Sequence, residues 1–170
     1  MIIIVFGLPG SGKSFFASLL AKEINAEYIS SDILRKQIFP HRNYSTEEKQ
    51  KVYDSMLAIV KEAMKQNKIL VLDATFYKND LRRKFFEAAK RMDEVIFIEV
   101  QAEEELIEER LQRKRTDSEA GFEVYKKIRS EWEPMKEEHL ILQSTNDNIN
   151  KLLEQALHHL RFKDDKRTDQ

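Results

Sequence analysis

The chain has 170 residues, 41% of them hydrophobic and 35% charged, a balance typical of one soluble globular domain and not of a disordered chain. Its formal net charge is −1, so binding to nucleic acid would need a local basic patch. It has no cysteine, which excludes disulfide bonds and thiolate metal sites. The apolar start, residues 1–6, is too short for a membrane span and lacks the basic residues of a signal peptide. We therefore expect a cytoplasmic protein with no membrane partner and no obligate protein partner.

Apolar runs and helical patterns alternate along the chain. The expected strands are residues 2–6, 27–30, 69–72, 95–98 and a weak fifth at 141–142. The expected helices cover residues 13–24, 31 to just before Pro40, a long stretch that opens at 46, then 80–91, 103–113, 119–132 and 148–161. This order predicts an α/β protein of three layers, in which helices flank a mostly parallel five-stranded sheet. We expect one domain over residues 1–162 and a charged, frayed tail over 163–170.

The glycine-rich turn between the first strand and the first helix reads GLPGSGKS over residues 7–14 and fits G-x-x-x-x-G-K-[ST] at every fixed position. Glycines let backbone N–H groups surround phosphates, and a serine hydroxyl at this place is a ligand for magnesium. Lys13 is expected to act in catalysis as a mobile cation on the β- and γ-phosphates. This P-loop predicts a P-loop NTPase fold that binds ATP with Mg²⁺. The residues expected to bind the nucleotide are Gly7, Gly10, Ser11, Gly12, Lys13 and Ser14.

Asp73 directly follows the apolar run at residues 69–72. In P-loop proteins an acid in this place lies beside the loop and orients magnesium or its water. We expect Ser14 and Asp73 to be the residues linked to the metal. The alternative for Asp73 is an ordinary strand-end aspartate that caps the next turn.

Asp32 and Arg35 open the helix after the second strand, at the edge of the sheet where α/β proteins bind ligands. Their spacing of three places both side chains on one face of a helix. A carboxylate takes the proton of an acceptor hydroxyl, and a cation stabilises a phosphoryl group in transfer. We interpret Asp32 as a general base and Arg35 as a catalytic cation. The alternative is a capping aspartate in a surface ion pair with Arg35.

Four stretches together resemble the small P-loop kinases related to polynucleotide 5′-hydroxyl kinase, with gluconate kinase, zeta toxin and adenylylsulfate kinase as more distant relatives. These stretches are the P-loop, Ser31-Asp32-x-x-Arg35, LDATF at residues 72–76, and Arg110-x-x-Arg113. The resemblance covers roughly residues 1–135. It implies that Asp32 is the general base and that Arg35 contacts the scissile phosphate. It specifies a kinase better than it specifies the acceptor.

The resemblance also implies a helical lid at about residues 103–120. A lid that closes over ATP brings arginines to its phosphates and excludes water. We expect Arg110 and Arg113 to be the catalytic lid cations, with Lys114 or Arg115 as the alternative to Arg113. The same segment also fits an exposed, charged helix face held by internal ion pairs.

Thr75, Phe76 and Arg82 follow the third strand and are expected to line the acceptor side. In this interpretation Arg82 or Arg83 holds a phosphate of the acceptor, and the ring of Phe76 or Tyr77 stacks on a base. The alternative places Phe76 in the core and both arginines on a solvated helix face. The loop after Pro40 supplies further acceptor-side candidates, which are His41, Arg42 and Tyr44.

The site residues together predict an ATP-dependent phosphotransferase. Its expected acceptor is the 5′-OH end of DNA or RNA, so the expected partners are ATP and a single-stranded nucleic acid end. The alternative is a small-molecule kinase that acts on a sugar, nucleoside or antibiotic hydroxyl, and the net charge of −1 favours it slightly. A third hypothesis, an ATP-hydrolysing switch, needs a water-positioning residue for which the sequence has no signature.

Overall fold

Five parallel strands form the central sheet of the computed structural model, which describes residues 1–41, 43–89, 95–112 and 121–168. The strands, in the spatial order β2-β3-β1-β4-β5, are β1 (Ile2–Phe6), β2 (Glu27–Ser30), β3 (Leu70–Asp73), β4 (Val95–Gln101) and β5 (Leu140–Gln143). The helices are α1 (Lys13–Glu23), α2 (Ser31–Ile38), α3 (Thr46–Lys65), α4 (Asn79–Ala88), α5 (Glu104–Gln112), α6 (Phe122–Ser130) and α7 (Ile149–Thr168). Every strand pairs in parallel with its neighbours, so the predicted α/β fold is confirmed.

The largest extensions beyond the predicted ranges are those of β4 and α7. β4 runs to Gln101. The sequence does not predict this continuation, because a strand buried on both faces is recognised by an unbroken apolar run and Glu99 interrupts that run. α7 continues to Thr168, through most of the tail expected at 163–170, where lysines and arginines favour the helical backbone. Part of the expected lid, residues 113–120, lies outside the described residues. No helix of the described part of the chain has both the length and the apolar character needed to cross a membrane.

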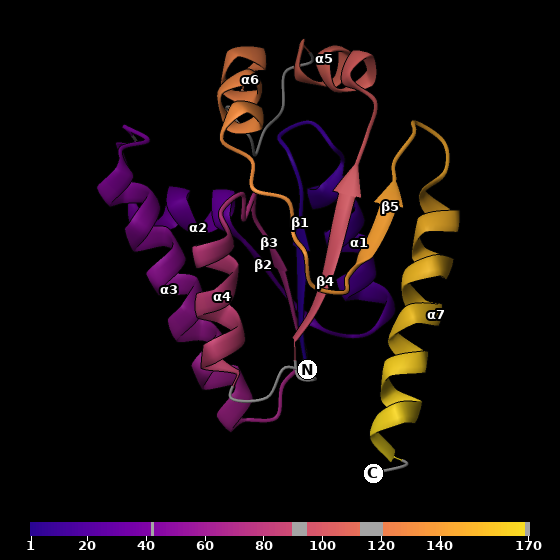
Figure 1. The fold of residues 1–170 in the computed structure, drawn as a ribbon. Coiled ribbons are helices and arrows are strands. Elements are labelled where there is room, and N and C mark those ends of the chain that lie inside the picture. The colour runs from indigo at the N-terminus through magenta and orange to yellow at the C-terminus, as the bar shows by residue number, and fades with distance from the viewer. Residues whose placement is uncertain (42, 90–94, 113–120, 169–170) are drawn as a thin grey trace.

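Helices cover both faces of the sheet, which gives the three predicted layers (Figure 1). On one face α3 and α4 pack against Ile2, Ile4 and Phe6 of β1. On the other face α1 and α7 pack against Ile3 and Val5. All five side chains are fully buried, so β1 is the common wall of two hydrophobic cores. α5 and α6 lie beyond the carboxyl ends of the strands, over the edge where β1 enters the P-loop (Figure 1).

The register of the sheet brings three chain segments to this edge. Asp73 of β3 pairs with Val5 of β1 on one side and with Ser30 of β2 on the other. The P-loop follows β1 almost at once, and α2 follows β2 directly. Because the carboxyl ends of these parallel strands lie level, the P-loop, Asp73 and the start of α2 meet at one site.

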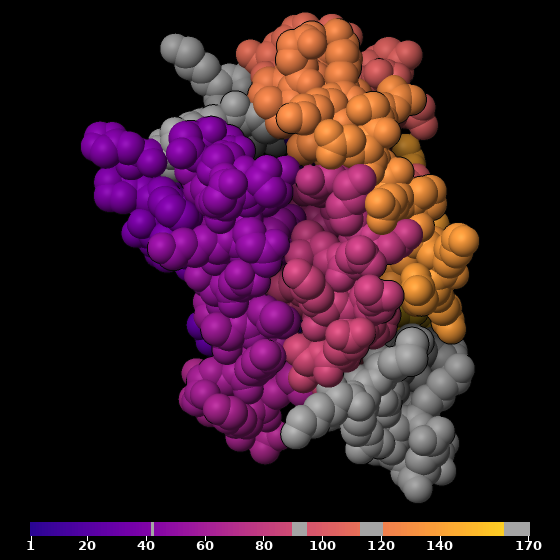
Figure 2. All heavy atoms as spheres, turned by 60° about the vertical axis from the view of Figure 1, so that its left-hand side comes forward, coloured from indigo at the N-terminus to yellow at the C-terminus, as the bar shows by residue number. Residues whose placement is uncertain are grey.

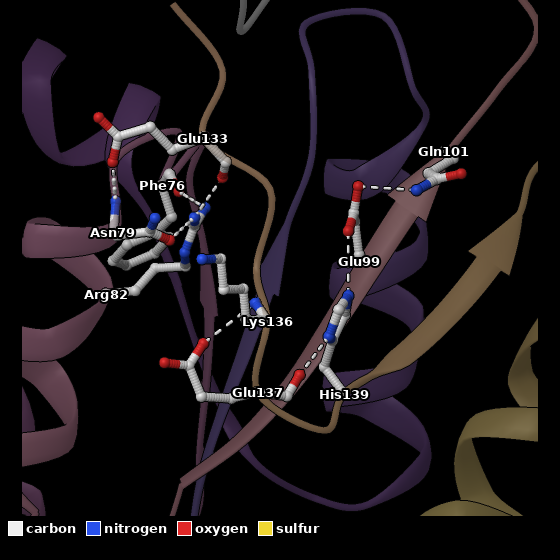
Figure 3. Close-up of polar contacts among 9 residues, drawn as sticks. All are labelled: Phe76, Asn79, Arg82, Glu99, Gln101, Glu133, Lys136, Glu137 and His139. Atoms are coloured by element: carbon white, nitrogen blue, oxygen red, sulfur yellow. Dashed lines mark hydrogen bonds and ion pairs between the residues drawn. The ribbon is translucent and has the colours of Figure 1, made fainter.

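Arg82 on α4 is a buried cation that joins two segments (Figure 3). Its Nη1 donates to the carbonyl oxygen of Phe76 at 2.6 Å, and its Nη2 donates to the Asn79 side chain and to the carbonyl oxygen of Glu133. These contacts hold α4 against the segment that follows α6, which runs beside α4 on the face shown in Figure 2. Burial also lowers the pKa of Arg82. The predicted role of Arg82 as a ligand for an acceptor phosphate is therefore wrong, because only 2% of this residue is exposed.

Replacing Arg82 tests this structural role against a neighbour with the same charge. Arg82→Met leaves buried carbonyl groups without their donor, so we expect the free energy of unfolding to fall by about 2–4 kcal/mol. Arg83 is exposed and pairs with Asp80 and Glu87 on its own helix, so Arg83→Met should change the free energy of unfolding by less than about 0.5 kcal/mol. Urea denaturation of both variants measures the difference. Equal losses of stability in the two variants would contradict the role of Arg82 as a buried residue that joins α4 to the segment after α6.

Candidate active site

The P-loop forms the turn between β1 and α1, where the sequence predicts it. Gly10 and Gly12 have φ values of 83° and 93°, in the left-handed region that favours glycine. A Cβ atom at Gly10 would lie 2.8 Å from Cγ2 of Ile107 on α5. A Cβ atom at Gly12 would lie 2.9 Å from the Ser144 hydroxyl oxygen after β5. The loop is thus packed closely on its outer side by α5 and by the turn after β5, which only glycine allows.

Arg110 on α5 fastens this outer side of the P-loop. Its Nη1 donates to the carbonyl oxygens of Gly10 and Ser11, at 3.3 and 3.1 Å. It also contacts the turn after β5, where it lies 3.2 Å from the Ser144 hydroxyl and donates to the Thr145 carbonyl oxygen at 2.8 Å. Arg110 thus lies against the outer side of the P-loop and is not among the cavity-lining residues, so its role as a lid cation stays a prediction. The other lid candidates, Arg113, Lys114 and Arg115, lie outside the described residues.

Asp73 lies buried beside the P-loop and is joined to Ser14 through a tyrosine. The Tyr28 hydroxyl donates to Asp73 Oδ2 at 2.9 Å and lies 3.5 Å from the Ser14 carbonyl oxygen. Burial, together with the neighbouring Asp73 carboxylate, raises the pKa of Tyr28, so this phenol keeps its proton. Asp73 Oδ1 is buried and has no hydrogen-bond partner among the described residues. A carboxylate oxygen and a hydroxyl are ligands suited to Mg²⁺ or to its water, so Asp73 and Ser14 fit the predicted metal.

Asp32 and Arg35 lie on one face of α2, as their spacing predicts, and they form the ion pair that the non-catalytic alternative expects. Arg35 Nη1 lies 3.3 Å from Asp32 Oδ1, and its Nε lies 3.2 Å from Oε1 of Glu48 on α3. Two carboxylates thus hold one guanidinium, and Asp32 keeps an exposed side. Burial, followed by the nearby Asp73 carboxylate, raises the pKa of Asp32, while Lys13 and Arg35 act in the opposite direction. A carboxylate with a raised pKa at a phosphate site is suited to take up a proton.

A cavity of about 280 Å³ connects the P-loop with Asp32 and Arg35. Five segments form its wall: the P-loop, α2, α3 with the loop before it, the turn after β3, and α6. The lining residues are Pro9, Gly10, Lys13, Ser14, Ser31, Asp32, Arg35, Tyr44, Lys49, Tyr53, Thr75, Tyr77, Val124, Lys127, Ile128 and Glu131. Phosphate-binding groups and the candidate base therefore face one shared space.

The structure places only part of the predicted acceptor-side residues at the cavity. Thr75, Tyr77 and Tyr44 line it, whereas Arg42 lies outside the described residues. Phe76 does not line the cavity, because its ring is fully buried between Tyr53 and Phe85, 5.2 and 5.0 Å away between centroids. The predicted stacking of Phe76 on an acceptor base is therefore wrong. Phe76, like Arg82, belongs to the core that supports the cavity.

A family model described as AAA domain matches residues 2–137. The chain belongs to this AAA-domain family. The L-seryl-tRNA(Sec) kinase of Methanococcus maripaludis is 34% identical over 97 residues, which are 55% of this chain and 37% of that protein. The chain thus matches little more than a third of the length of this curated relative.

Solved structures of kinases share the fold over nearly the whole chain. A sugar kinase from Janibacter sp. HTCC2649 has a TM-score of 0.74 at 17% identity and covers 94% of both chains. A gluconokinase from Sinorhizobium meliloti has a TM-score of 0.72 at 19% identity, over 98% of this chain and 95% of that one. The APS kinase CysC of Mycobacterium tuberculosis has a TM-score of 0.69 at 17% identity, over 94% of this chain and 96% of that one. These names agree with the predicted enzyme class, and at such identities the likeness establishes the fold alone.

The sequence did not predict Glu48, Tyr28, the α6 wall, or the α3 residues Lys49 and Tyr53 that line the cavity. A local sequence pattern could have drawn attention to Glu48, because Ser45 and Glu48 have the spacing of a capping box. The Ser45 hydroxyl accepts from the Glu48 N–H at 3.2 Å. The pattern that could have indicated Tyr28 is weaker: this residue lies two positions before the end of β2, and the neighbouring strand β3 ends in Asp73. No local sequence pattern predicts the α6 wall, because contacts between residues distant in the sequence hold α6 in place.

Asp73→Asn tests the metal-linked role by binding rather than by activity. Asparagine keeps the shape but loses the charge, so we expect the Mg²⁺ concentration that half-saturates MgATP binding to rise about 10–100-fold. Calorimetric titration with ATP at several MgCl₂ concentrations measures it. Asp54→Asn, at an exposed position of α3, is the control and should leave the Mg²⁺ dependence unchanged. An unchanged dependence in Asp73→Asn would contradict the assignment.

Proposed function

We propose that the protein is an ATP-dependent phosphotransferase that moves the γ-phosphoryl group of ATP onto a hydroxyl group. One observation carries this proposal: a single cavity is lined both by Lys13 and Ser14 of the P-loop and by the Asp32–Arg35 pair. A site that only hydrolysed ATP would not need a pKa-shifted carboxylate and a guanidinium opposite the P-loop. The APS kinase neighbour, solved with AMPPNP and APS, supports ATP as the donor.

In the proposed reaction each residue has one role. The Asp32 carboxylate takes the proton of the acceptor hydroxyl as its oxygen attacks the γ-phosphorus. The bond between the γ-phosphorus and the β,γ-bridging oxygen breaks, and ADP leaves with that electron pair. Lys13 and Arg35 stabilise the negative charge on the phosphoryl oxygens during transfer. Asp32 ends protonated and returns its proton to solvent when the products leave.

The P-loop and its neighbours complete the donor site in this proposal. Backbone N–H groups of residues 7–14 hold the phosphates, and Ser14 with Asp73 holds or orients magnesium. Bound Mg²⁺ would neutralise charge on the phosphates. We place Arg110 in the lid. Because it donates hydrogen bonds to P-loop carbonyl oxygens, a movement of α5 would also move the P-loop of the donor site. Arg113 is proposed as the second lid cation on the resemblance alone.

The proposed acceptor is a hydroxyl on a small compound. The cavity volume of about 280 Å³ is near the lower end for small-molecule sites. Of the residues that favoured a nucleic acid base and phosphate, Phe76 and Arg82 are buried in the core. Arg83 is exposed and pairs on its own helix, so Tyr77 is the one of the four that lines the cavity. A hydroxyl carried by nucleic acid, such as a 5′-OH end, is the second candidate. The similarity to an L-seryl-tRNA(Sec) kinase supports it.

Asp32→Asn separates this kinase from an ATP-hydrolysing switch. Without the general base we expect phosphoryl transfer to fall about 10²–10⁴-fold, while the dissociation constant of ATP changes little. Transfer of labelled γ-phosphate to a panel of alcohols, with ATP binding measured in parallel, gives both values. A variant that turns over ATP as fast as the wild type would contradict the proposed base.

The pH dependence of the reaction tests the same residue in the unmodified enzyme. Asp32 must be ionised to accept a proton, and its raised pKa means that ionisation is lost at a higher pH than for an ordinary aspartate. We therefore expect kcat/KM to decline, as pH falls, with an apparent pKa above the ordinary aspartate value of about 3.9. An acidic limb at or below that value would contradict the role of Asp32. A rapid steady-state assay across pH 4–8 (roughly the range that spans this limb) measures the profile.

A further inference from the structure

We propose that the wall formed by α3, the turn after β3 and α6 is a specificity subsite for an anionic group of the acceptor. The substrate class is then an alcohol that carries a carboxylate or a phosphate. This inference rests on the proposed function, because it concerns the acceptor end of the same cavity. Lys49 and Lys127 are the residues that define it.

Lys49 is a half-buried cation whose polar partner is a neutral phenol. Its Nζ lies 3.1 Å from the Tyr77 hydroxyl and 4.9 Å from the centroid of that ring. Among the described residues, no carboxylate lies within ion-pair distance of it. A partly desolvated ammonium gains most from a counter-charge, which an anionic ligand in the cavity would supply.

Lys127 is an exposed residue that lines the cavity and, among the described residues, lacks the carboxylate partner that the other cations of α6 have. Lys126 pairs with Glu123 at 2.9 Å, and Arg129 pairs with Glu104 of α5. Lys127 is the α6 cation that lines the cavity, and its ammonium pairs with no carboxylate of the described chain. The basic residues of α6 that face away from the cavity are thus neutralised within the protein, whereas the one at the cavity is not.

The charges of the wall favour an anion over a neutral or cationic group. Of the cations that line the cavity, Lys13 belongs to the P-loop and Arg35 is held by Asp32 and Glu48. Lys49 and Lys127 remain, against the single carboxylate of Glu131 on the described part of this wall. Two ammonium groups outnumber it, so the lining residues of this wall carry a formal positive charge that favours an anion.

The backbone around the subsite is fixed before any ligand binds. The Glu133 N–H donates to the Tyr77 carbonyl oxygen at 2.9 Å, and the Glu133 carboxylate accepts from the Asn79 N–H at 2.7 Å. Arg82 adds its own bond to the Glu133 carbonyl oxygen (Figure 3). The end of α6 and the turn that carries Tyr77 are therefore held together. A fixed wall discriminates between ligands at a lower ordering cost than a mobile one.

Pairs of alcohols that differ in charge test the inference. We compare glucose with gluconate and with glucose 6-phosphate, and ribose with ribose 5-phosphate, as acceptors of labelled γ-phosphate from ATP. We expect kcat/KM at least 10-fold higher for an anionic member than for its neutral partner. The carboxylate and phosphate members show which anion the subsite takes.

Substitutions of Lys49 and Lys127 then test whether these two lysines cause the preference for anionic acceptors. Lys49→Gln and Lys127→Gln should each raise KM for the anionic acceptor about 10-fold and leave KM for ATP within twofold. Lys49→Arg keeps the cation and should retain the acceptor KM within threefold, which separates charge from misfolding. Lys126→Gln, a neighbour that does not line the cavity, is the matched control and should change neither value.

Several results would overturn the inference. Neutral alcohols used as well as their anionic partners would remove the subsite, as would lysine variants that raise KM for ATP instead of the acceptor. A strong preference for a 5′-OH oligonucleotide over every small alcohol would assign the wall to a polymer. Each of these leaves the proposed kinase intact if transfer still depends on Asp32. Release of inorganic phosphate alone, at a rate that Asp32→Asn does not change, would instead refute the proposed function.

Discussion

The pairing of Asp73 between Val5 and Ser30 is the constraint on which the site depends. It sets the ends of three parallel strands level, and each end then delivers a different chemical part. β1 leads into the phosphate-binding loop, β3 ends in the buried carboxylate, and β2 leads directly into the helix that begins next to Asp32. A shift of one residue in this register would turn the Asp73 side chain to the opposite face of the sheet. The fully buried β1, packed on both faces, is what prevents such a shift.

The acceptor side is built by longer-range contacts. The buried Arg82 and the carboxylate of Glu133 tie the turn after β3 to the segment after α6, and α6 thereby becomes a wall of the cavity. Arg110 plays a related part on the donor side, where it joins α5 to the P-loop and to the turn after β5. The two guanidinium groups thus connect the sheet edge to the helices that lie over it (Figure 1).

Local patterns were sufficient for two parts of the site, the P-loop and the Asp32–Arg35 contact, because both follow from spacing along one turn or one helix. The acceptor half was mispredicted at Arg82, although its spacing of three from the buried Phe85 and seven from Ala89 places it on the inward face of α4. Charged residues are usually exposed, and Arg82 can be buried on that face because the carbonyl oxygens of Phe76 and of the sequence-distant Glu133 accept hydrogen bonds from its guanidinium. The place of α6 depends on the same contacts, so no local pattern predicts it.

The central claim is that the γ-phosphoryl group of ATP passes to an alcohol beside Asp32. Phosphorus NMR of the reaction products tests this most directly, because it separates a phosphate monoester from inorganic phosphate. With MgATP and a suitable alcohol, the account predicts a new monoester signal that grows in equal amount with ADP and that requires Asp32. Inorganic phosphate as the only product, formed at the same rate with and without every alcohol of the panel, would contradict it.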